Sequence, residues 1–145
     1  MSTIDFKLTL IGKSEEYIKL ITDYEKYTEY LPDQIKSVKV LEKSSDYTIT
    51  EETLHLSSII SKTFVQQTKH YSIFENILKS EILSGPAKGS IIKLKVNEIE
   101  EKTTIFLEIQ IKLEFRYKIL LPIIKKSYRI FFTGILYKMQ NSLIT

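Results

Sequence analysis

The feature that most constrains the fold is a long alternation of apolar and polar residues between positions 103 and 117. The apolar positions are Ile105, Leu107, Ile109, Ile111, Leu113, Phe115 and Tyr117, and the polar positions are Glu108, Gln110, Lys112, Glu114 and Arg116. A period of two is typical of a strand with one buried face. The pattern therefore predicts a long strand in an antiparallel sheet that is wet on one side.

The same period predicts six more strands. They are expected at residues 3–11, 35–42, 46–56, 59–70, 72–84 and 90–99. Turn-forming sequences separate several of them, at Ser44-Ser45-Asp46, Ser84-Gly85-Pro86 and Glu100-Glu101-Lys102. Because these connections are short, neighbouring strands in sequence are expected to pair in one antiparallel sheet.

Two short helices are expected between the first two strands. Ser14 is predicted to cap the first, because two glutamates follow it in the first turn. Asp23 is predicted to cap the second, which ends before Pro32. The i, i+3 spacing of this second helix puts three aromatic side chains on one side. They are Tyr24, Tyr27 and Tyr30.

The C-terminal segment is expected to form one long amphipathic helix. Its apolar residues recur every three or four positions, at Leu120, Ile124, Tyr128, Phe131, Ile135 and Met139. The sheet and this helix each have one apolar side. Laying the helix across the concave face of a curved sheet buries both of these sides against each other. The sequence thus predicts an α+β architecture, with residues 1–145 as a single domain.

Between Arg129 and Lys138 this helix is apolar nearly all round. Three explanations are open: packing against the short helices, which is preferred, a dimer partner, or a membrane surface flanked by Lys125, Lys126 and Arg129. Charged residues interrupt the segment from 119 to 144, so it is not expected to cross a bilayer. A glycine at position 134 lowers helix stability by about 1 kcal/mol relative to alanine. A close approach of backbone or ligand at this position would explain why glycine is tolerated there.

Composition excludes several classes of site. The chain has no cysteine, which removes disulfides, zinc–thiolate sites, iron–sulfur ligation and thiol nucleophiles and favours the cytoplasm. The first residues resemble a strand and not a targeting segment. The net charge of +3 comes mostly from Lys, with Arg only at positions 116 and 129, so no nucleic-acid partner is expected.

The catalytic inventory is small. HExxH, GxSxG, P-loop and GxGxxG sequences are absent, and the only histidines, His55 and His70, fall in separate strands. No metal site and no cofactor is expected. If the protein is an enzyme, His70 and the pair Glu51 and Glu52 are the best acid–base candidates, and the alternative is that they are solvated strand residues.

Four stretches together carry a family resemblance: "DYEKYTEYLP", "IKSVKVLE", "LSGPAKGS" and the long closing helix. In this order they resemble the SRPBCC superfamily, whose START-like helix-grip fold occurs in polyketide cyclases and dehydrases, coenzyme Q-binding proteins, lipid-transfer domains and the major birch-pollen allergen. The resemblance covers essentially the whole chain and points to no single subfamily.

The resemblance implies a cavity between sheet and long helix that holds an apolar or amphipathic small molecule. The tyrosine helix would lie at its mouth, or equally would pack the short helices onto the sheet. The ligand-wall candidates are Leu94, Val96, Ile109, Ile111, Leu113, Phe115, Phe131, Ile135 and Met139. The alternative for each of them is ordinary core.

The stretch "ENILKSEIL" adds polar candidates. If Phe74, Leu78 and Ile82 point inward, Asn76 and Ser80 point inward with them, and each would need a hydrogen-bond partner. The opposite register would expose Asn76 and Ser80.

The first functional hypothesis is therefore a protein that binds or carries a hydrophobic small molecule: a lipid, an isoprenoid quinone or a polyketide-like compound. The second is a cyclase/dehydrase-type enzyme that uses the same cavity. The third is a protein-interaction module with a filled interior and an exposed apolar patch. A monomer or homodimer is expected, with membrane contact if the ligand is collected from a bilayer.

Overall fold

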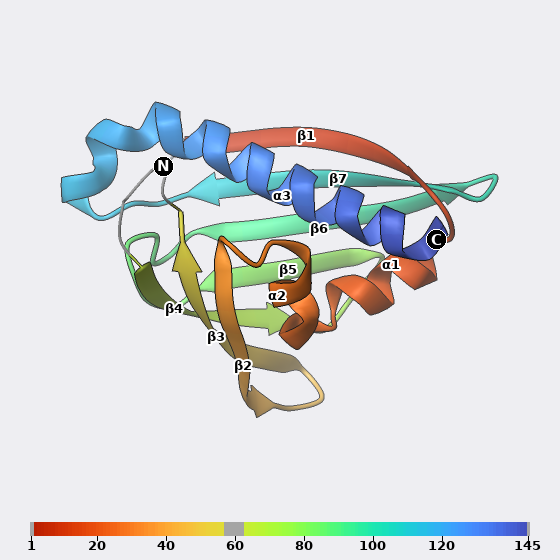
Figure 1. The fold of residues 1–145 in the computed structure, drawn as a ribbon, viewed down its shortest axis with the longest axis horizontal. Coiled ribbons are helices and arrows are strands. Elements are labelled where there is room, and N and C mark those ends of the chain that lie inside the picture. Colours follow the sequence, from red (N-terminus) through yellow and green to blue (C-terminus); the bar gives the residue numbers. More distant parts are fainter. Residues whose placement is uncertain (1, 57–62, 145) are drawn as a thin grey trace.

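The computed structural model describes residues 2–56 and 63–144 (Figure 1). Within them, seven strands form one antiparallel sheet. The strands are β1 (Ser2–Ile11), β2 (Ile35–Lys43), β3 (Tyr47–His55), β4 (Thr63–Tyr71), β5 (Ile77–Ile82), β6 (Ile91–Ile99) and β7 (Lys102–Ile111). The helical elements are α1 (Ser14–Ile21), the 3-10 turn η1 (Tyr24–Lys26), α2 (Tyr27–Tyr30), the 3-10 segment η2 (Phe115–Leu120) and α3 (Leu121–Ile144). The predicted α+β helix-grip fold is confirmed, with α3 laid across the concave face of a curved sheet.

The strand order is β1-β7-β6-β5-β4-β3-β2. Strands β2 to β7 follow one another as predicted, whereas β1 pairs with β7, the last strand of the chain. The helical insertion between β1 and β2 makes this possible, because it carries the chain from one edge of the sheet to the other (Figure 1). Residues 59–62 of the predicted strand 59–70 lie outside the described residues.

The strand predicted at residues 103–117 ends early, at Ile111. Its neighbours explain this, because β1 begins at Ser2, opposite Ile111, and β6 begins at Ile91, opposite Gln110. Among the described residues, neither neighbouring strand pairs with the chain beyond Ile111, so no ladder hydrogen bonds hold it there. Phe115 therefore does not lie on the concave face as predicted: it lies in η2 and is 88% exposed.

The strand predicted at residues 72–84 is also shorter, because a tight turn interrupts its start. Glu75 and Asn76 have φ angles of 50° and 63°, and a single bridge pairs Phe74 with Ile77 around them. Asparagine tolerates this left-handed conformation better than most residues. The predicted alternation therefore holds only within β5, where Leu78 is buried. Phe74 lies before the turn, outside β5, and is 74% exposed instead of pointing inward as predicted.

Neither predicted helix cap forms. Ser14 is the first residue of α1, and its backbone N–H and hydroxyl both donate to Glu98 Oε1, at 2.8 and 3.1 Å. Asp23 precedes η1 without a side-chain capping bond and lies 4.0 Å from the Lys26 Nζ atom. In both places the polar side chain lies near another side chain and makes no hydrogen bond to the first backbone N–H groups of its helix.

Helix α3 has a buried side and an exposed apolar side. Ile124, Ile135, Leu136 and Met139 are buried against the sheet, while Ile130 is exposed. Packing on the short helices therefore explains only part of its apolar circumference. No helix within the described residues combines the length and apolar character needed to cross a bilayer.

Candidate functional site

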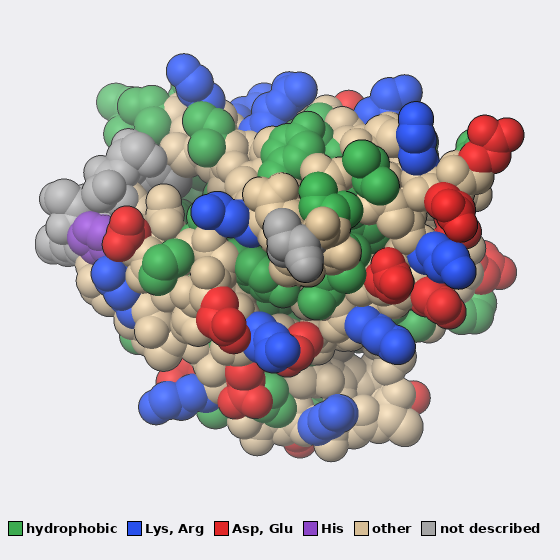
Figure 2. All heavy atoms as spheres, turned by 45° about the vertical axis from the view of Figure 1, so that its right-hand side comes forward, with side chains coloured by type: hydrophobic (Ala, Val, Ile, Leu, Met, Phe, Trp, Pro, Cys, Tyr) green, Lys and Arg blue, Asp and Glu red, His purple; other side chains and the backbone are tan. Residues whose placement is uncertain are grey.

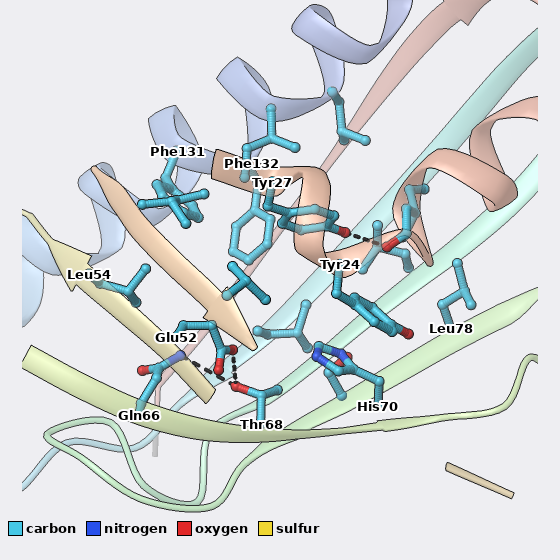
Figure 3. A pocket seen from close by; sticks show the side chains of 18 of the residues that line it. Tyr24, Tyr27, Glu52, Leu54, Gln66, Thr68, His70, Leu78, Phe131 and Phe132 are labelled. Atoms are coloured by element: carbon cyan, nitrogen blue, oxygen red, sulfur yellow. Dashed lines mark hydrogen bonds between the residues drawn. The ribbon is translucent and has the colours of Figure 1, made fainter. Parts of the chain in front are cut away.

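A cavity of about 130 Å³ lies between the concave face of the sheet and α3. Its roof is apolar and comes mainly from α3, and Figure 3 shows Phe131 and Phe132 reaching down from that helix beside Tyr27. The helix residues that line it are Phe131, Phe132, Ile135, Leu136 and Met139. Another hollow, of about 490 Å³, is lined largely by charged residues such as Lys93, Lys95 and Glu108 and is open to solvent. The cavity under α3 is therefore the candidate site.

The floor of this cavity is polar, unlike its roof. Inward-facing polar residues of β3, β4 and β5 are direct neighbours across the ladders, which pair Glu52 with Gln66, Thr50 with Thr68 and His70 with Ser80. Thr50, Gln66 and Thr68 are buried. Three adjacent strands thus place six polar side chains together on a concave face that is mostly apolar.

His70 is held by two hydroxyl groups and one ring. Its Nε2 is 2.9 Å from Thr50 Oγ1 and its Nδ1 is 2.7 Å from Ser80 Oγ. The imidazole stacks on Tyr24, with ring centroids 4.0 Å apart and planes at 15°. Burial disfavours the imidazolium and lowers the pKa of His70 to about 4. The ring is therefore neutral near pH 7, with both nitrogens already engaged.

Glu52 has one engaged oxygen and one free one. Its Oε1 accepts a hydrogen bond of 2.5 Å from Thr68 Oγ1, which in turn accepts one of 3.5 Å from Gln66 Nε2 (Figure 3). Its Oε2 is buried and has no hydrogen-bond partner among the described residues. Burial raises the pKa of Glu52 to about 7, and the neighbouring hydrogen-bonding groups of Thr68, Thr50 and Gln66 partly offset this rise. Near neutral pH this carboxyl group therefore exists in both protonation states.

The three tyrosines take different places. Tyr24 and Tyr27 line the cavity, and the Tyr27 hydroxyl donates to the Ile21 carbonyl oxygen at 2.5 Å instead of reaching water. Tyr30 packs against the hydrophobic core outside the cavity lining. Burial raises the pKa of Tyr24 to about 12. Tyr24 and Tyr27 thus contribute rings to the cavity wall, and Tyr30 fits the packing alternative.

The structure brings eight of the predicted ligand-binding residues together at the cavity. They are Tyr24, Tyr27, Leu78, Ser80, Leu94, Phe131, Ile135 and Met139. Their role in binding stays a prediction.

The other predicted residues lie elsewhere. Val96 is buried in the main core, and Ile109 and Ile111 belong to a second buried cluster under the start of α3. Leu113 borders a separate pocket of about 20 Å³. Phe74 and Asn76 belong to the exposed turn before β5. None of these lines the main cavity.

Of the acid–base candidates, Glu52 and His70 line the cavity, so the alternative of solvated strand residues is wrong for them. Glu51 is absent from the cavity lining, and Gln67 Nε2 lies 3.5 Å from its Oε2. Sequence reasoning missed Thr50, Gln66 and Thr68. Both β3 and β4 carry polar residues on their two faces, so alternation alone does not show which face is buried. The available signals were two buried apolar residues, Leu54 on β3 and Ile82 on the neighbouring strand β5. Within residues 2–56 and 63–144, no three His, Cys, Asp or Glu side chains gather in a way that could hold a metal ion.

Comparison with known proteins gives structural matches only. No protein-family model matches the sequence, and no curated protein matches it significantly. Three solved structures align over nearly the whole chain. A START superfamily protein from Mycobacterium smegmatis has a TM-score of 0.80 at 12% identity, with 99% of each chain covered. The Zhui aromatase/cyclase from Streptomyces sp. R1128 has a TM-score of 0.82 at 9% identity, with 98% of this chain and 95% of that chain covered.

The third is a protein from Thermus thermophilus, with a TM-score of 0.83 at 14% identity and coverage of 99% of this chain and 97% of that chain. At these identities the likeness establishes the fold. The protein has the START-like helix-grip fold that the sequence resemblance implied.

Proposed function

We propose that this protein binds a hydrophobic small molecule in the cavity between the sheet and α3. The observation that carries this proposal is the cavity itself, roofed by five apolar side chains of α3. Protein interiors are normally close-packed, and an unfilled apolar space costs stability. The helix-grip fold shared with START and aromatase/cyclase structures supports the same function. The third hypothesis, an interaction module, predicted a filled interior, so the cavity favours ligand binding over it.

The size of the cavity favours a compact ligand. Drug-sized ligand pockets have volumes of roughly 300–1,000 Å³, well above the 130 Å³ found here. Of the expected classes, a polyketide-like ring compound fits best, whereas a lipid or isoprenoid quinone would need α3 or the tyrosine segment to move. In this proposal residues 1–145 act as one ligand-binding domain, and the composition favours a cytoplasmic location.

Native mass spectrometry of the purified protein, followed by organic extraction, tests the binding function. We expect a stoichiometric apolar compound that leaves on denaturation. Leu94→Phe fills the cavity from β6, and Leu41→Phe makes the same change at an exposed position of β2. We expect Leu94→Phe to weaken binding of an apolar fluorescent probe by about tenfold or more and Leu41→Phe to leave it unchanged. Equal binding by both variants would contradict the site.

An acid–base enzyme is the second candidate function, favoured by Glu52. A general acid or base works best when its pKa lies near the operating pH, and burial places the pKa of Glu52 at about 7 beside an apolar cavity. If the extracted compound is a substrate, the wild-type protein should convert it over time. Glu52→Gln should bind it and leave its mass unchanged, while conversion by Glu52→Gln at the wild-type rate would refute the enzyme hypothesis.

Contact with an anionic membrane surface is proposed for the outer side of η2 and α3. Ile123, Ile130, Tyr137 and Ile144 recur every seven residues, which places them on one side of the helix, and all are exposed. We call these four residues, with Ile119 in η2, the α3 ridge. Figure 2 shows hydrophobic side chains in the upper middle of that face, with Lys and Arg along its upper edge.

Charge favours a membrane over a second copy of the chain as the occupant of the α3 ridge. Residues 115–144 contain six basic residues and no acidic ones, although the whole chain carries only +3. A self-dimer through this ridge would bring basic side chains against basic side chains. Anionic lipid headgroups would neutralise them while the ridge enters the interface.

A further inference from the structure

We infer that the cavity selects ligands that carry a hydroxyl group on an apolar body, and that Glu52 Oε2 forms the hydrogen bond to this hydroxyl. The inference rests on the proposed binding function and names the polar group that the ligand must present.

The first argument is that one fully buried atom of the polar floor has no hydrogen-bond partner among the described residues. Thr50, His70 and Ser80 form one connected set, and Gln66, Thr68 and Glu52 form another. Within the part of the chain that the structure describes, the one buried side-chain nitrogen or oxygen without a partner is Glu52 Oε2. Buried polar atoms are nearly always hydrogen-bonded, and leaving one unpaired is unfavourable. This atom is therefore the place where a ligand gains most by supplying a partner.

The second argument is that the carboxyl group is held in place before a ligand arrives. The buried Thr68 hydroxyl donates to Oε1, and the buried Gln66 amide donates to that hydroxyl. In Figure 3 the Glu52 side chain extends from β3 into the space between the sheet and the side chains of α3. A preorganised group of this kind loses little freedom on binding.

The third argument concerns charge. The titratable side chains that line the cavity with Glu52 are His70 and Tyr71 from β4, Lys79 from β5, Tyr24 from η1 and Tyr27 from α2. His70 is neutral near pH 7, and Lys79 Nζ lies 5.3 Å from the centre of the Tyr71 ring. Because successive side chains of a strand point to opposite faces, Lys79 points away from the face of Leu78 and Ser80. The floor therefore places no cation beside Glu52, and an ionised Glu52 would repel an anionic ligand.

A hydroxyl is a small neutral group that suits both protonation states of Glu52. It donates to the ionised carboxylate and accepts from the protonated carboxyl group. A ketone can bond only to the protonated form, so its binding should weaken as pH rises through about 7, the pKa of Glu52. A ligand without a polar group leaves Oε2 unpaired.

The size of the cavity sets the probe. An engineered apolar cavity of roughly 150 Å³ binds benzene, so the 130 Å³ found here suits one aromatic ring, and a second fused ring would extend into the opening of this partly open cavity. Three naphthalenes differ only in the substituent at position 2: a hydroxyl in 2-naphthol, a methyl group of similar size in 2-methylnaphthalene and a carboxylate in naphthalene-2-carboxylate. A fourth, 2-acetylnaphthalene, supplies a ketone.

Titration calorimetry of the intact protein with these four probes, at pH 5.5 and pH 8, tests the inference. We expect 2-naphthol to bind about tenfold more tightly than 2-methylnaphthalene at both pH values. We expect the carboxylate and the ketone to bind more weakly at pH 8 than at pH 5.5, because only the protonated Glu52 can donate to them.

Three variants separate the role of Glu52 from general effects. Glu52→Met removes the hydrogen-bonding group at similar size, and the preference for 2-naphthol over 2-methylnaphthalene should fall to within about twofold. Glu52→Gln keeps hydrogen bonding but cannot titrate, so the pH dependence of ketone binding should disappear. Glu51→Met changes the preceding residue, which does not line the cavity, and should keep the wild-type pattern. Thermal unfolding of each variant checks that it folds.

The outcomes distinguish the two proposals. If the four probes bind alike and Glu52→Met changes nothing, the cavity binds apolar compounds and Glu52 does not select among them. Tightest binding of the carboxylate would likewise overturn the inference. If no probe binds the wild-type protein at all, both the inference and the proposed binding function fail.

Discussion

At the scale of single residues, burial disfavours the charged forms of two side chains in the cavity floor, Glu52 and His70. Their effects on stability depend on pH in opposite directions. The folded protein holds the Glu52 proton up to about pH 7, whereas the unfolded chain releases it near the ordinary value of 4.5. The contribution of Glu52 to the free energy of unfolding therefore falls as pH rises from 4.5 to 7. His70 stays neutral down to about pH 4 when folded, against 6.5 when unfolded, so its contribution falls as pH drops through that range.

Glu52→Gln should stabilise the protein at alkaline pH. The change removes the need to bury a charge at pH 8, and the pKa shift corresponds to at most about 3 kcal/mol in the free energy of unfolding. Below pH 4.5, where the wild-type carboxyl group is protonated in both states, the gain should vanish. Urea unfolding at pH 8 and pH 4.5 measures this. Glu51→Gln is the matched control, and a stabilisation of Glu52→Gln that is the same at both pH values would contradict the prediction.

The imidazole of His70 should resist protonation. We expect its proton NMR signals to stay constant from pH 8 to 5.5 and to shift with a midpoint near pH 4, because burial penalises the imidazolium. His70→Gln identifies the signals by removing them. A midpoint near 6.5 would show that the ring is open to water and would weaken the description of the cavity floor.

At the scale of elements, α3 explains why the C-terminal sequence is apolar nearly all round. One side roofs the cavity and the other forms the exposed α3 ridge, so a single amphipathic stripe could not describe it. The glycine in this helix has a separate explanation. A methyl group on Gly134 would lie 3.7 Å from Leu31 Cδ2, an ordinary van der Waals distance, so the approach of Leu31 does not require glycine.

Gly134→Ala should therefore raise the free energy of unfolding by up to about 1 kcal/mol, since alanine loses less backbone entropy in a helix. Gly85→Ala is the opposing control: its φ is +90° and a methyl group there would lie 3.2 Å from the Val65 carbonyl oxygen, so it should destabilise. Urea unfolding of both variants measures the difference. Destabilisation by Gly134→Ala would mean that the helix needs a closer approach than the distances indicate.

Binding to vesicles tests the α3 ridge. The double variant Ile119→Glu and Ile123→Glu should bind anionic vesicles several-fold less than the wild type, because it adds two negative charges to an apolar surface beside basic residues. Both positions are exposed, Ile119 by 87%, so folding should be unaffected. Co-sedimentation with phosphatidylcholine vesicles, with and without phosphatidylserine, measures binding.

Val65→Glu, at an exposed position of β4, is the control for added charge. It should bind vesicles nearly as the wild type does, and salt should weaken binding by both. An equal loss in Val65→Glu and in the ridge variant would indicate general charge repulsion, and the ridge would then have no special role.

At the scale of the whole molecule, the cavity depends on contacts that span the chain. Strand β1 closes the sheet against β7, and α3 then runs alongside β1, β7 and β6, with side chains that reach the same cavity as those of β3, β4 and β5 (Figure 1). The roof thus comes from residues 131–139 of α3, and the polar floor comes from β3, β4 and β5. A ligand that touches both should stabilise the folded protein as a unit.

Saturation with a ligand should therefore raise the stability of the entire fold. At a free concentration of 100 times Kd, we expect the free energy of unfolding to rise by about 2.7 kcal/mol. Urea unfolding with and without 2-naphthol measures this, and Leu94→Phe should show little increase. A rise that is equal in both proteins would place the ligand outside the cavity.

The sequence by itself determined the types and order of the elements, because periods of two and of three to four are local properties of the chain. The strands and the long helix were predictable for this reason, and so were the inward positions of Phe131, Ile135 and Met139. Only the tertiary structure decided where β7 stops and which polar residues meet, because both depend on partners elsewhere in the chain. Glu52 and His70 lie on different strands, and their burial and shifted pKa values arise only when α3 covers the floor that β3, β4 and β5 build together.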